Sequence, residues 1–354
     1  MPEILNVADW PTVWVIAAFA GAAAIICFAG TKLARVAEQL AIITGLGQAV
    51  TGAVMLGLTT SLSGTVVSIS AAARGDAELA ISNGLGGIAA QTVFLAVADF
   101  FHRKANLEHA AASTANLFQL GLLISLLGLI LVAFTGPEVA VWRLHPVSII
   151  LPIAWLAGML IAQRTHDRPG WRPAGSQYDV ESDQSSESST EVRHDAWKLW
   201  AMLAGLGALV FIGGLTLSTT APRIAETTGL SQSAVGALFT ATITSLPELV
   251  TTVAAVRNGA LVLAVGDIIG GNAFDTLFTA AADLAYAGGS IYHAVSDREL
   301  FVTTLGIVLS GVLLMGLLGR EKEGPAKIGW ESWLIILLYV SGMTTLVLMD
   351  GAGA

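Results

Sequence analysis

Long apolar runs alternate with short polar segments along this chain. A helix needs about 20 apolar residues to cross a bilayer, and reading with a window of that length predicts ten membrane-spanning helices. The second and the seventh are long and are interrupted by Gly, Thr, Ser or Pro, as expected of tilted or broken helices. The pattern therefore predicts an all-α, polytopic membrane protein. The ten spans are expected near residues 12–30, 42–72, 77–101, 112–135, 146–163, 197–219, 230–257, 260–286, 299–319 and 330–349.

One polar segment in the middle of the chain differs from the other connections. Residues 164–196 are rich in Ser and acidic residues and are almost free of aliphatic side chains. This composition is typical of a solvated linker, although its acidic residues could also bind a regulatory cation. We predict that the linker divides the chain into two five-helix halves, residues 1–163 and residues 197–354.

Composition narrows the class of protein further. Hydrophobic residues make up 54% of the chain and charged residues only 12%, about half the charged share of a soluble domain. These values exclude a disordered chain, a coiled coil and an ordinary cytosolic enzyme. The net charge of −9 says little about partners, because seven of the acidic residues lie in the linker.

The distribution of Lys and Arg predicts the orientation in the membrane. The linker and the loops on its face hold thirteen of these residues, and the loops on the opposite face hold four. Cytoplasmic loops carry the excess of positive charge, so we expect a cytoplasmic linker and both termini outside, in a prokaryotic plasma membrane. The N-terminal segment has no basic residue before the first apolar run, so a cleaved signal peptide is not expected.

The chain matches itself at an offset of 184 residues. The match needs no gap over residues 45–99, and it aligns the Thr-Ser-Leu at 60–62 with the one at 244–246, and Asp99 with Asp283. Because five spans is an odd number, the second half must lie upside down relative to the first. Inverted repeats of this kind are typical of secondary transporters, whose substrate site lies near the membrane midplane where broken helices meet.

Acidic side chains within the apolar segments are the candidate chemistry. Glu248 directly follows Pro247, and a proline inside a helix frees an upstream carbonyl. A carboxylate there is costly unless it faces a cavity or an ion, and no Lys or Arg lies in the span interiors to pair with it. Together with the hydroxyls of Thr244 and Ser245 and the carboxylate of Asp275, it offers the all-oxygen shell that hard cations prefer.

These residues resemble the motifs of the calcium/cation antiporter superfamily, which includes sodium/calcium and proton/calcium exchangers. Its hallmark is a pair of inverted repeats, each with a motif like G-T-S-L-P-E followed by G-N-x-x-G-S-N-x-x-D/N. The second repeat follows this pattern at residues 244–248 and 266–275, except that Asp267 and Gly271 stand where the family has Asn and often has Ser. The resemblance implies that Glu248 and Asp275 are the principal ligands of the metal ion, and that Thr244 and Ser245 add oxygens.

The first repeat departs from the family pattern. Ser63 and Gly64 stand where Pro and Glu are expected, and Gln91 is the counterpart of Asp275. One of the two central glutamates is therefore absent. The neutral oxygen donors expected from this repeat are Thr60, Ser61, Ser63 and Gln91.

Further polar residues inside apolar segments have two open interpretations. Asp99 and Asp283 are repeat counterparts that either carry protons and line an entry path or cap the ends of their helices. The same proton or entry-path role is considered for Asp267, Asn272 and Asn83. Asn272 lies three residues before the candidate ligand Asp275, so the two share a helix face.

From these residues and the resemblance we predict a secondary cation antiporter, exchanging a divalent cation such as calcium for sodium or protons by alternating access. Two carboxylates neutralise one divalent cation or two monovalent ones, so we expect electroneutral exchange. Oxygen ligands do not choose among the hard cations. The sequence has no G-x-x-x-x-G-K-[ST] motif, and we expect no cofactor and no nucleic-acid partner, only inorganic cations and the lipid bilayer.

Two other classes of protein were weighed against transport. The absence of the first-repeat glutamate permits a transport-inactive, ion-sensing or scaffold relative of the exchangers. An intramembrane aspartyl protease needs a Gly-x-Gly-Asp motif, and the corresponding stretch, residues 264–267, lacks the first glycine. We therefore expect that the protein is not an enzyme.

Overall fold

The computed structural model describes residues 7, 9–44, 59–100, 107, 111–167, 196–319 and 328–351. Apart from one isolated bridge between Val141 and Leu144, the regular secondary structure of these residues is helical. Eight helices in this part of the chain are long and apolar enough to cross a membrane, or up to nine with one bent pair counted as a span. The chain is therefore an all-helical integral membrane protein. Residues 45–58 of the predicted span at 42–72 lie outside the described residues.

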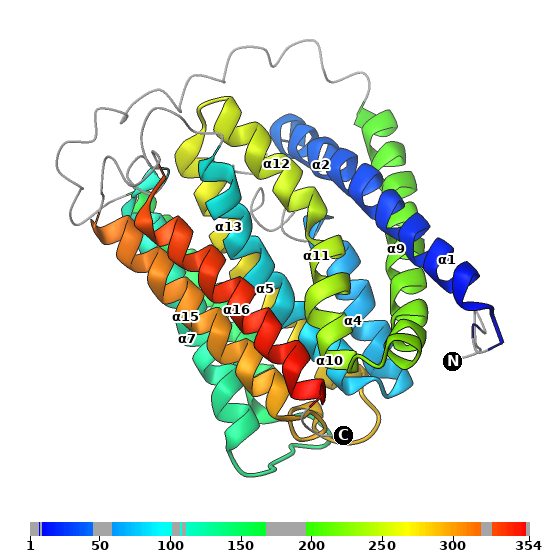
Figure 1. The fold of residues 1–354 in the computed structure, drawn as a ribbon. Helices are drawn as coiled ribbons and strands as arrows, with labels where there is room; N and C mark the ends of the chain where they lie inside the picture. Colours follow the sequence, from blue (N-terminus) through cyan, green and yellow to red (C-terminus); the bar gives the residue numbers. More distant parts are fainter. Residues whose placement is uncertain are drawn as a thin grey trace.

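The helices follow one another in two comparable series (Figure 1). The first half contains α1 (Thr12–Ile25), the π-helical turn η1 (Ile26–Gly30), α2 (Thr31–Thr44), α4 (Leu62–Arg74), α5 (Ala77–Asp99), α7 (Thr114–Thr135) and α8 (Pro146–Asp167). The second half contains α9 (Ala196–Thr228), α10 (Gln232–Ala234), the π-helical segment η3 (Val235–Thr240), α11 (Ala241–Thr244), α12 (Leu246–Arg257), α13 (Leu261–Asp275), α14 (Leu277–Ala285), the 3-10 turn η4 (Ile291–His293), α15 (Asp297–Gly319) and α16 (Trp330–Gly351).

The predicted ends of the first and sixth spans were wrong. Helix continues without a break from Thr12 to Thr44 and from Ala196 to Thr228, well beyond the predicted ends at residues 30 and 219. Hydropathy marks where a helix leaves the apolar layer, whereas the hydrogen bonds of the backbone continue through the more polar α2 and the last turns of α9. The two long helices also support each other, because α9 packs against both α1 and α2.

The repeat extends through the whole described fold. Helices α1, α5 and α8 begin 184 residues before α9, α13 and α16, the same interval that separates Gln91 from Asp275. The repeat counterparts α1 and α9 pack against each other and run in opposite directions, so that α1 begins and α16 ends at the end of the bundle opposite the start of α9 (Figure 1). This is the geometry expected of an inverted repeat.

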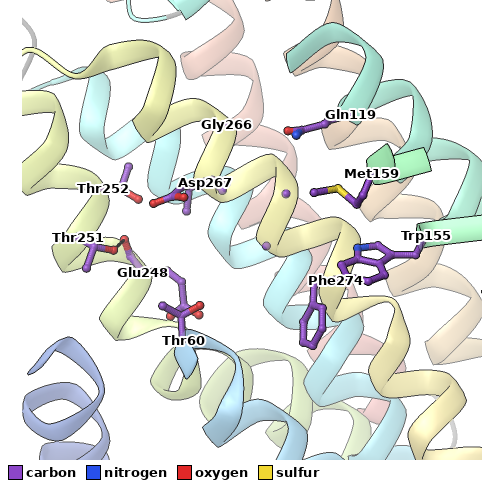
Figure 2. Close-up of a pocket in the computed structure, with 13 residues that line it drawn as sticks. Thr60, Gln119, Trp155, Met159, Glu248, Thr251, Thr252, Gly266, Asp267 and Phe274 are labelled. Carbon is purple, nitrogen blue, oxygen red and sulfur yellow. Dashed lines mark hydrogen bonds between the residues drawn. The ribbon is translucent and has the colours of Figure 1, made fainter. Parts of the chain in front are cut away.

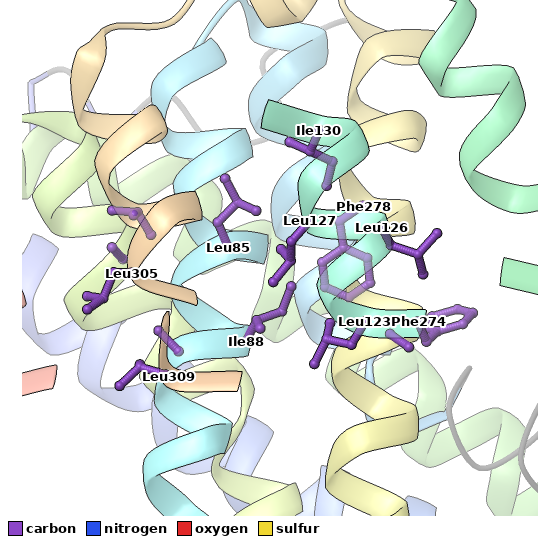
Figure 3. Close-up of a cluster of buried hydrophobic side chains, with 14 of the residues drawn as sticks. Leu85, Ile88, Leu123, Leu126, Leu127, Ile130, Phe274, Phe278, Leu305 and Leu309 are labelled. Atoms are coloured by element: carbon purple, nitrogen blue, oxygen red, sulfur yellow. The ribbon is translucent and has the colours of Figure 1, made fainter. Parts of the chain in front are cut away.

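Helix α5 lies at the centre of the bundle (Figure 1), with 89% of its most apolar window buried. Leu85 and Ile88 of this helix contribute to a continuous apolar core with side chains of α7 and α15, including Leu127 and Leu309 (Figure 3). The peripheral helices α1, α8, α9 and α16 are only 28% buried over the corresponding window. Their apolar outer faces suit contact with lipid.

Two helices are interrupted at equivalent positions of the repeats. The backbone leaves helical geometry at Ser61, directly before α4, and at Ser245, directly before α12. The second of these breaks bends the pair Gln232–Thr244 and Leu246–Arg257 by 46°. Pro247 stands within the first turn of α12, where no intrahelical N–H bond is lost. The predicted interruption of the seventh span is confirmed.

Asp99 and Asp283 make matching sets of hydrogen bonds at the ends of α5 and α14. Asp99 accepts hydrogen bonds from the backbone N–H groups of Leu107 (2.8 Å) and Gly329 (3.1 Å) and from the hydroxyl of Ser332 (3.3 Å). Two of these donors belong to the segment that begins α16, in the other repeat.

The bonds of Asp283 repeat this arrangement with the two halves exchanged. Its carboxylate accepts from the backbone N–H groups of Ile291 (2.9 Å) and His145 (2.9 Å) and from the hydroxyl of Ser148 (2.7 Å). Each donor lies at the repeat counterpart of a donor to Asp99. A carboxylate is favourable at a helix N-terminus, so the geometry favours anchoring of α8 and α16 over a role on an ion path.

Replacing either aspartate by Asn is expected to lower stability by about 1–3 kcal/mol, because an NH₂ group would face backbone donors that need an acceptor. Thermal unfolding of the purified protein in detergent measures the effect, with similar losses expected for Asp99→Asn and Asp283→Asn. Glu226→Gln is the matched control, since this exposed carboxylate pairs with the Arg223 guanidinium on its own helix. Unchanged stability together with a shifted pH profile of transport would support the proton-path interpretation instead.

Candidate functional site

The two helix breaks meet α5 and α13 at the centre of the molecule, where four buried polar residues form one network. Asp275 accepts a hydrogen bond from the Ser61 hydroxyl through Oδ1 (2.7 Å) and one from Gln91 Nε2 through Oδ2 (2.7 Å). Gln91 Nε2 also donates to the Ser245 hydroxyl (3.1 Å). The network joins two pairs of repeat counterparts, and each of the four residues is at most 3% exposed.

Two glycines at equivalent positions allow the helices to approach this network closely. An ideal Cβ at Gly87 would lie 3.5 Å from Ser245 Oγ and 3.7 Å from Asp275 Oδ2, and one at Gly271 would lie 3.5 Å from Gln91 Oε1. A longer side chain at either position would have to displace the network. Gly271 stands where the exchanger motif often has Ser, so it brings no hydroxyl to this site.

Glu248 lies beside the network, at the wall of a cavity of about 60 Å³, which has room for several water molecules. Its side chain is only 8% exposed. Thr60, Thr251, Thr252 and Asp267 line the cavity on the same side as Glu248 (Figure 2). The opposite wall consists of Gln119, Trp155, Met159 and Phe274.

Several buried oxygens at this site accept no hydrogen bond from the described part of the chain. They include Glu248 Oε2 and Gln91 Oε1, and also Asn272 Oδ1 and Asn83 Oδ1. Buried polar atoms are normally satisfied, and carboxylate and amide oxygens are the ligands that hard cations take. The donor set therefore fits a hard cation such as Ca²⁺ or Na⁺. Among the described residues, no group of three or more His, Cys, Asp and Glu side chains is placed to hold a metal ion.

Some of the other predicted residues line the cavity, and the rest make hydrogen bonds within the protein. Ser63 donates to the backbone oxygen of Thr244 (3.1 Å), and the hydroxyl of Thr244 donates to the backbone of its own helix. Asn83 Nδ2 donates to the backbone oxygen of Gly64 (3.1 Å), and Asn272 Nδ2 donates to a threonine hydroxyl of α5. The structure thus brings Asp275, Gln91, Ser61 and Ser245 together as one network, with Glu248, Thr60 and Asp267 on the adjoining cavity.

Three polar side chains that line the cavity were missed by the sequence analysis. Thr251 and Thr252 lie three and four residues after Glu248, and this spacing places them on the same helix face. That signal was available in the sequence. Gln119 belongs to α7, and only the packing of α7 against α13 brings it to this cavity.

A family model described as sodium/calcium exchanger protein matches residues 14–164 and 198–348. The chain belongs to this family. The resemblance derived from the motifs is confirmed, and the enzyme alternative is not supported, because the family is one of transporters.

A curated relative is the sodium/calcium exchanger MaX1 of Methanosarcina acetivorans. It is 28% identical over 139 residues, which make up 39% of this chain and 38% of the relative. The matched region thus spans well under half the length of that relative.

Solved exchanger structures share the fold over nearly the whole chain. The crystal structure of the H⁺/Ca²⁺ exchanger CAX has a TM-score of 0.69 at 11% identity, covering 95% of this chain and 85% of that one. Native YfkE has a TM-score of 0.64 at 14% identity, with coverages of 97% and 94%. The sodium-calcium exchanger NCX_Mj, soaked with 10 mM Na⁺ and zero Ca²⁺, has a TM-score of 0.59 at 16% identity, with coverages of 95% and 100%.

Proposed function

We propose that the protein is a secondary antiporter that exchanges a divalent cation such as calcium for sodium or protons. The observation that carries this proposal is the pair of buried carboxylates, Glu248 and Asp275, beside the two helix breaks, with Glu248 Oε2 facing a cavity and accepting no hydrogen bond from the described residues. The names of the relatives, which include sodium/calcium and H⁺/Ca²⁺ exchangers, support the same activity. No cofactor is needed for exchange of this kind.

Glu248 and Asp275 supply the charge that binds the cation in this proposal. Neutral oxygens come from Thr60, Ser61, Ser63, Gln91, Thr244 and Ser245. Asp267 lines the same cavity as Glu248, and we propose that it lies on the path by which cations reach the site. Its repeat counterpart is the neutral Asn83, so the corresponding path in the other half lacks this charge.

Alternating access requires part of the molecule to move relative to the site. Two small apolar clusters, separate from the main core, lie between the long helix formed by α1, η1 and α2 and its neighbours α4 and α9. One contains Ile26, Val67 and Leu217, and the other contains Leu33 and Val210. We propose that this helix and its counterpart α9 slide across the inner helices, since small apolar contacts can re-form after a shift.

The membrane arrangement is proposed from the sequence. Ten spans would form two inverted five-helix halves, residues 1–163 and 197–354, joined by the linker at 164–196. The distribution of Lys and Arg supports a cytoplasmic linker and external termini, in a prokaryotic plasma membrane.

Exchange is expected to be electroneutral. Two carboxylates balance one divalent cation or two monovalent ones, and uncompensated charge inside the membrane is costly. Purified protein in proteoliposomes should take up ⁴⁵Ca²⁺ when a Na⁺ or pH gradient is imposed, and a voltage-sensitive dye should report no change in membrane potential. A potential generated by transport would contradict the predicted stoichiometry.

The same flux experiment tests the alternative of a transport-inactive relative. That alternative was suggested by Gly64, which stands in place of the first-repeat glutamate. The other two expected carboxylates, Glu248 and Asp275, are present. Uptake panels with Ca²⁺, Mg²⁺ and Mn²⁺ under each gradient would identify the ions. Protein that binds these cations but carries none across the bilayer would favour the ion-sensing or scaffold role.

A further inference from the structure

Gly64 is the first-repeat counterpart of Glu248, and its surroundings differ from those of the glutamate. An ideal Cβ built at Gly64 would lie 2.7 Å from Cε2 and 3.2 Å from Cζ of Phe278. Side-chain carbons do not approach each other to 2.7 Å, so a side chain at position 64 cannot coexist with the ring in this place. The ring of Phe278 thus stands where the glutamate of the first repeat would begin.

The ring is held in this place from several sides. Phe278 is 4% exposed and makes an edge-to-face contact with Phe274, with ring centroids 6.2 Å apart. Phe274 in turn makes an edge-to-face contact with Trp155 at 5.5 Å, and both phenylalanines lie beside the leucines of α7 (Figure 3). An ideal Cβ at Gly84 of α5 would lie 3.2 Å from Cβ of Phe278. The ring is therefore enclosed between α4 and α5, and it cannot turn away without disturbing the core.

Two backbone carbonyl oxygens near Gly64 already accept hydrogen bonds within the protein. The carbonyl of Gly64 accepts from Asn83 Nδ2, and the carbonyl of Thr244 accepts from the hydroxyl of Ser63. By contrast, Glu248 Oε2 accepts no hydrogen bond from any described residue. The second-repeat half of the site presents the carboxylate of Glu248 beside a cavity. At position 64, the first-repeat half presents an aromatic ring and backbone carbonyls that already accept hydrogen bonds.

We infer that Phe278 seals the position of the absent first-repeat glutamate, so that no side chain from position 64 reaches the cation and the two second-repeat carboxylates, Glu248 and Asp275, carry the charge of the site. The inference rests on the proposed function. A cation must replace its hydration shell by oxygen ligands, and the ring supplies none.

The steric part of the inference is tested by stability. Gly64→Ala should lower the thermal unfolding temperature of the purified full-length protein, and adding Phe278→Leu should recover most of the loss, because Leu lacks the ring atoms that meet the new Cβ. The matched control replaces the repeat counterpart of Phe278, in Gly64→Ala/Phe94→Leu, and should recover nothing. Equal recovery by both double variants, or by neither, would overturn the seal.

The binding part is tested with ⁴⁵Ca²⁺ on the same preparations. Phe278→Ala should bind Ca²⁺ with an affinity similar to that of the wild type, since the ring is no ligand. Gly64→Glu/Phe278→Ala should bind Ca²⁺ roughly tenfold more tightly than Phe278→Ala, because ligand charge sets the affinity of calcium sites.

The outcomes separate this inference from the proposed function. A folded Gly64→Glu/Phe278→Ala variant that binds no more tightly than Phe278→Ala would overturn the seal while leaving the exchanger intact. If the folded wild type binds none of the tested divalent cations, the proposed function itself fails, whatever the stability measurements give.

Discussion

Glu248→Gln is expected to reduce ⁴⁵Ca²⁺ uptake into proteoliposomes by at least about 100-fold. The substitution keeps the size of the side chain but removes one of two carboxylates, which leaves a divalent cation with an uncompensated positive charge. A deficit of about 2.7 kcal/mol corresponds to a 100-fold loss in binding, and uncompensated charge inside a membrane costs at least this much. Flux at low Ca²⁺ concentration gives the most direct measurement.

Two variants serve as controls for this result. Glu248→Asp keeps the charge but withdraws it from the cavity, and it should lose less uptake than Glu248→Gln. Glu226→Gln removes a carboxylate that is 64% exposed and paired with Arg223 on its own helix, and it should transport like wild type. Normal Ca²⁺ uptake by folded Glu248→Gln would show that the carboxylate is not a ligand.

The second large effect is expected on folding. Gly86→Ala should destabilise the protein by about 3 kcal/mol, the upper end for overpacking of a tight core. An ideal Cβ at Gly86 would lie 2.8 Å from the carbonyl oxygen and 2.9 Å from Cβ of Ala237, and closer still to its Cα. These are atoms of the η3 segment, mostly backbone, so the clash cannot be relieved by a change of rotamer. Thermal unfolding and the monodisperse fraction on size exclusion measure the loss.

The repeat provides the matched control for Gly86. Its counterpart Gly270 has Gln119 Oε1, at 3.9 Å, as the nearest neighbour among the described residues. Gly270→Ala should therefore fold like wild type, although both substitutions add the same methyl group to equivalent helices. Equal stability of the two variants would contradict the close approach of α5 to η3.

Much of the fold could be predicted because a membrane restricts the secondary structures that the chain can adopt. Backbone groups in lipid must be satisfied within a helix, so apolar runs identified the spans α5, α7, α8, α15 and α16 closely. The same physics explains the errors at the ends of the first and sixth spans, because a helix can continue after its apolar stretch has ended. The break at Ser245 could be foreseen from the proline and glutamate that follow it.

The candidate site was predicted in part. Glu248 and Asp275 were singled out because isolated acids are costly in apolar segments, and the 184-residue offset paired Asp275 with Gln91. The hydrogen bond between Gln91 and Asp275, 2.7 Å long, is a product of packing between the two halves. The sequence left the role of Asp99 and Asp283 open, because an acidic residue at a helix end can either cap the helix or line an ion path.

The sequence alone determined the helical membrane class, the inverted repeat and the two acids in the second half, because all three follow from periodicity and from the cost of burying charge. The tertiary structure decided which side chain occupies the place of the absent first-repeat glutamate. Gly64 and Phe278 are 214 residues apart. Nothing in this spacing indicates that the ring of Phe278 fills the space beside Gly64. Steric exclusion acts between neighbours in space, and the inverted packing of the two halves makes these residues neighbours.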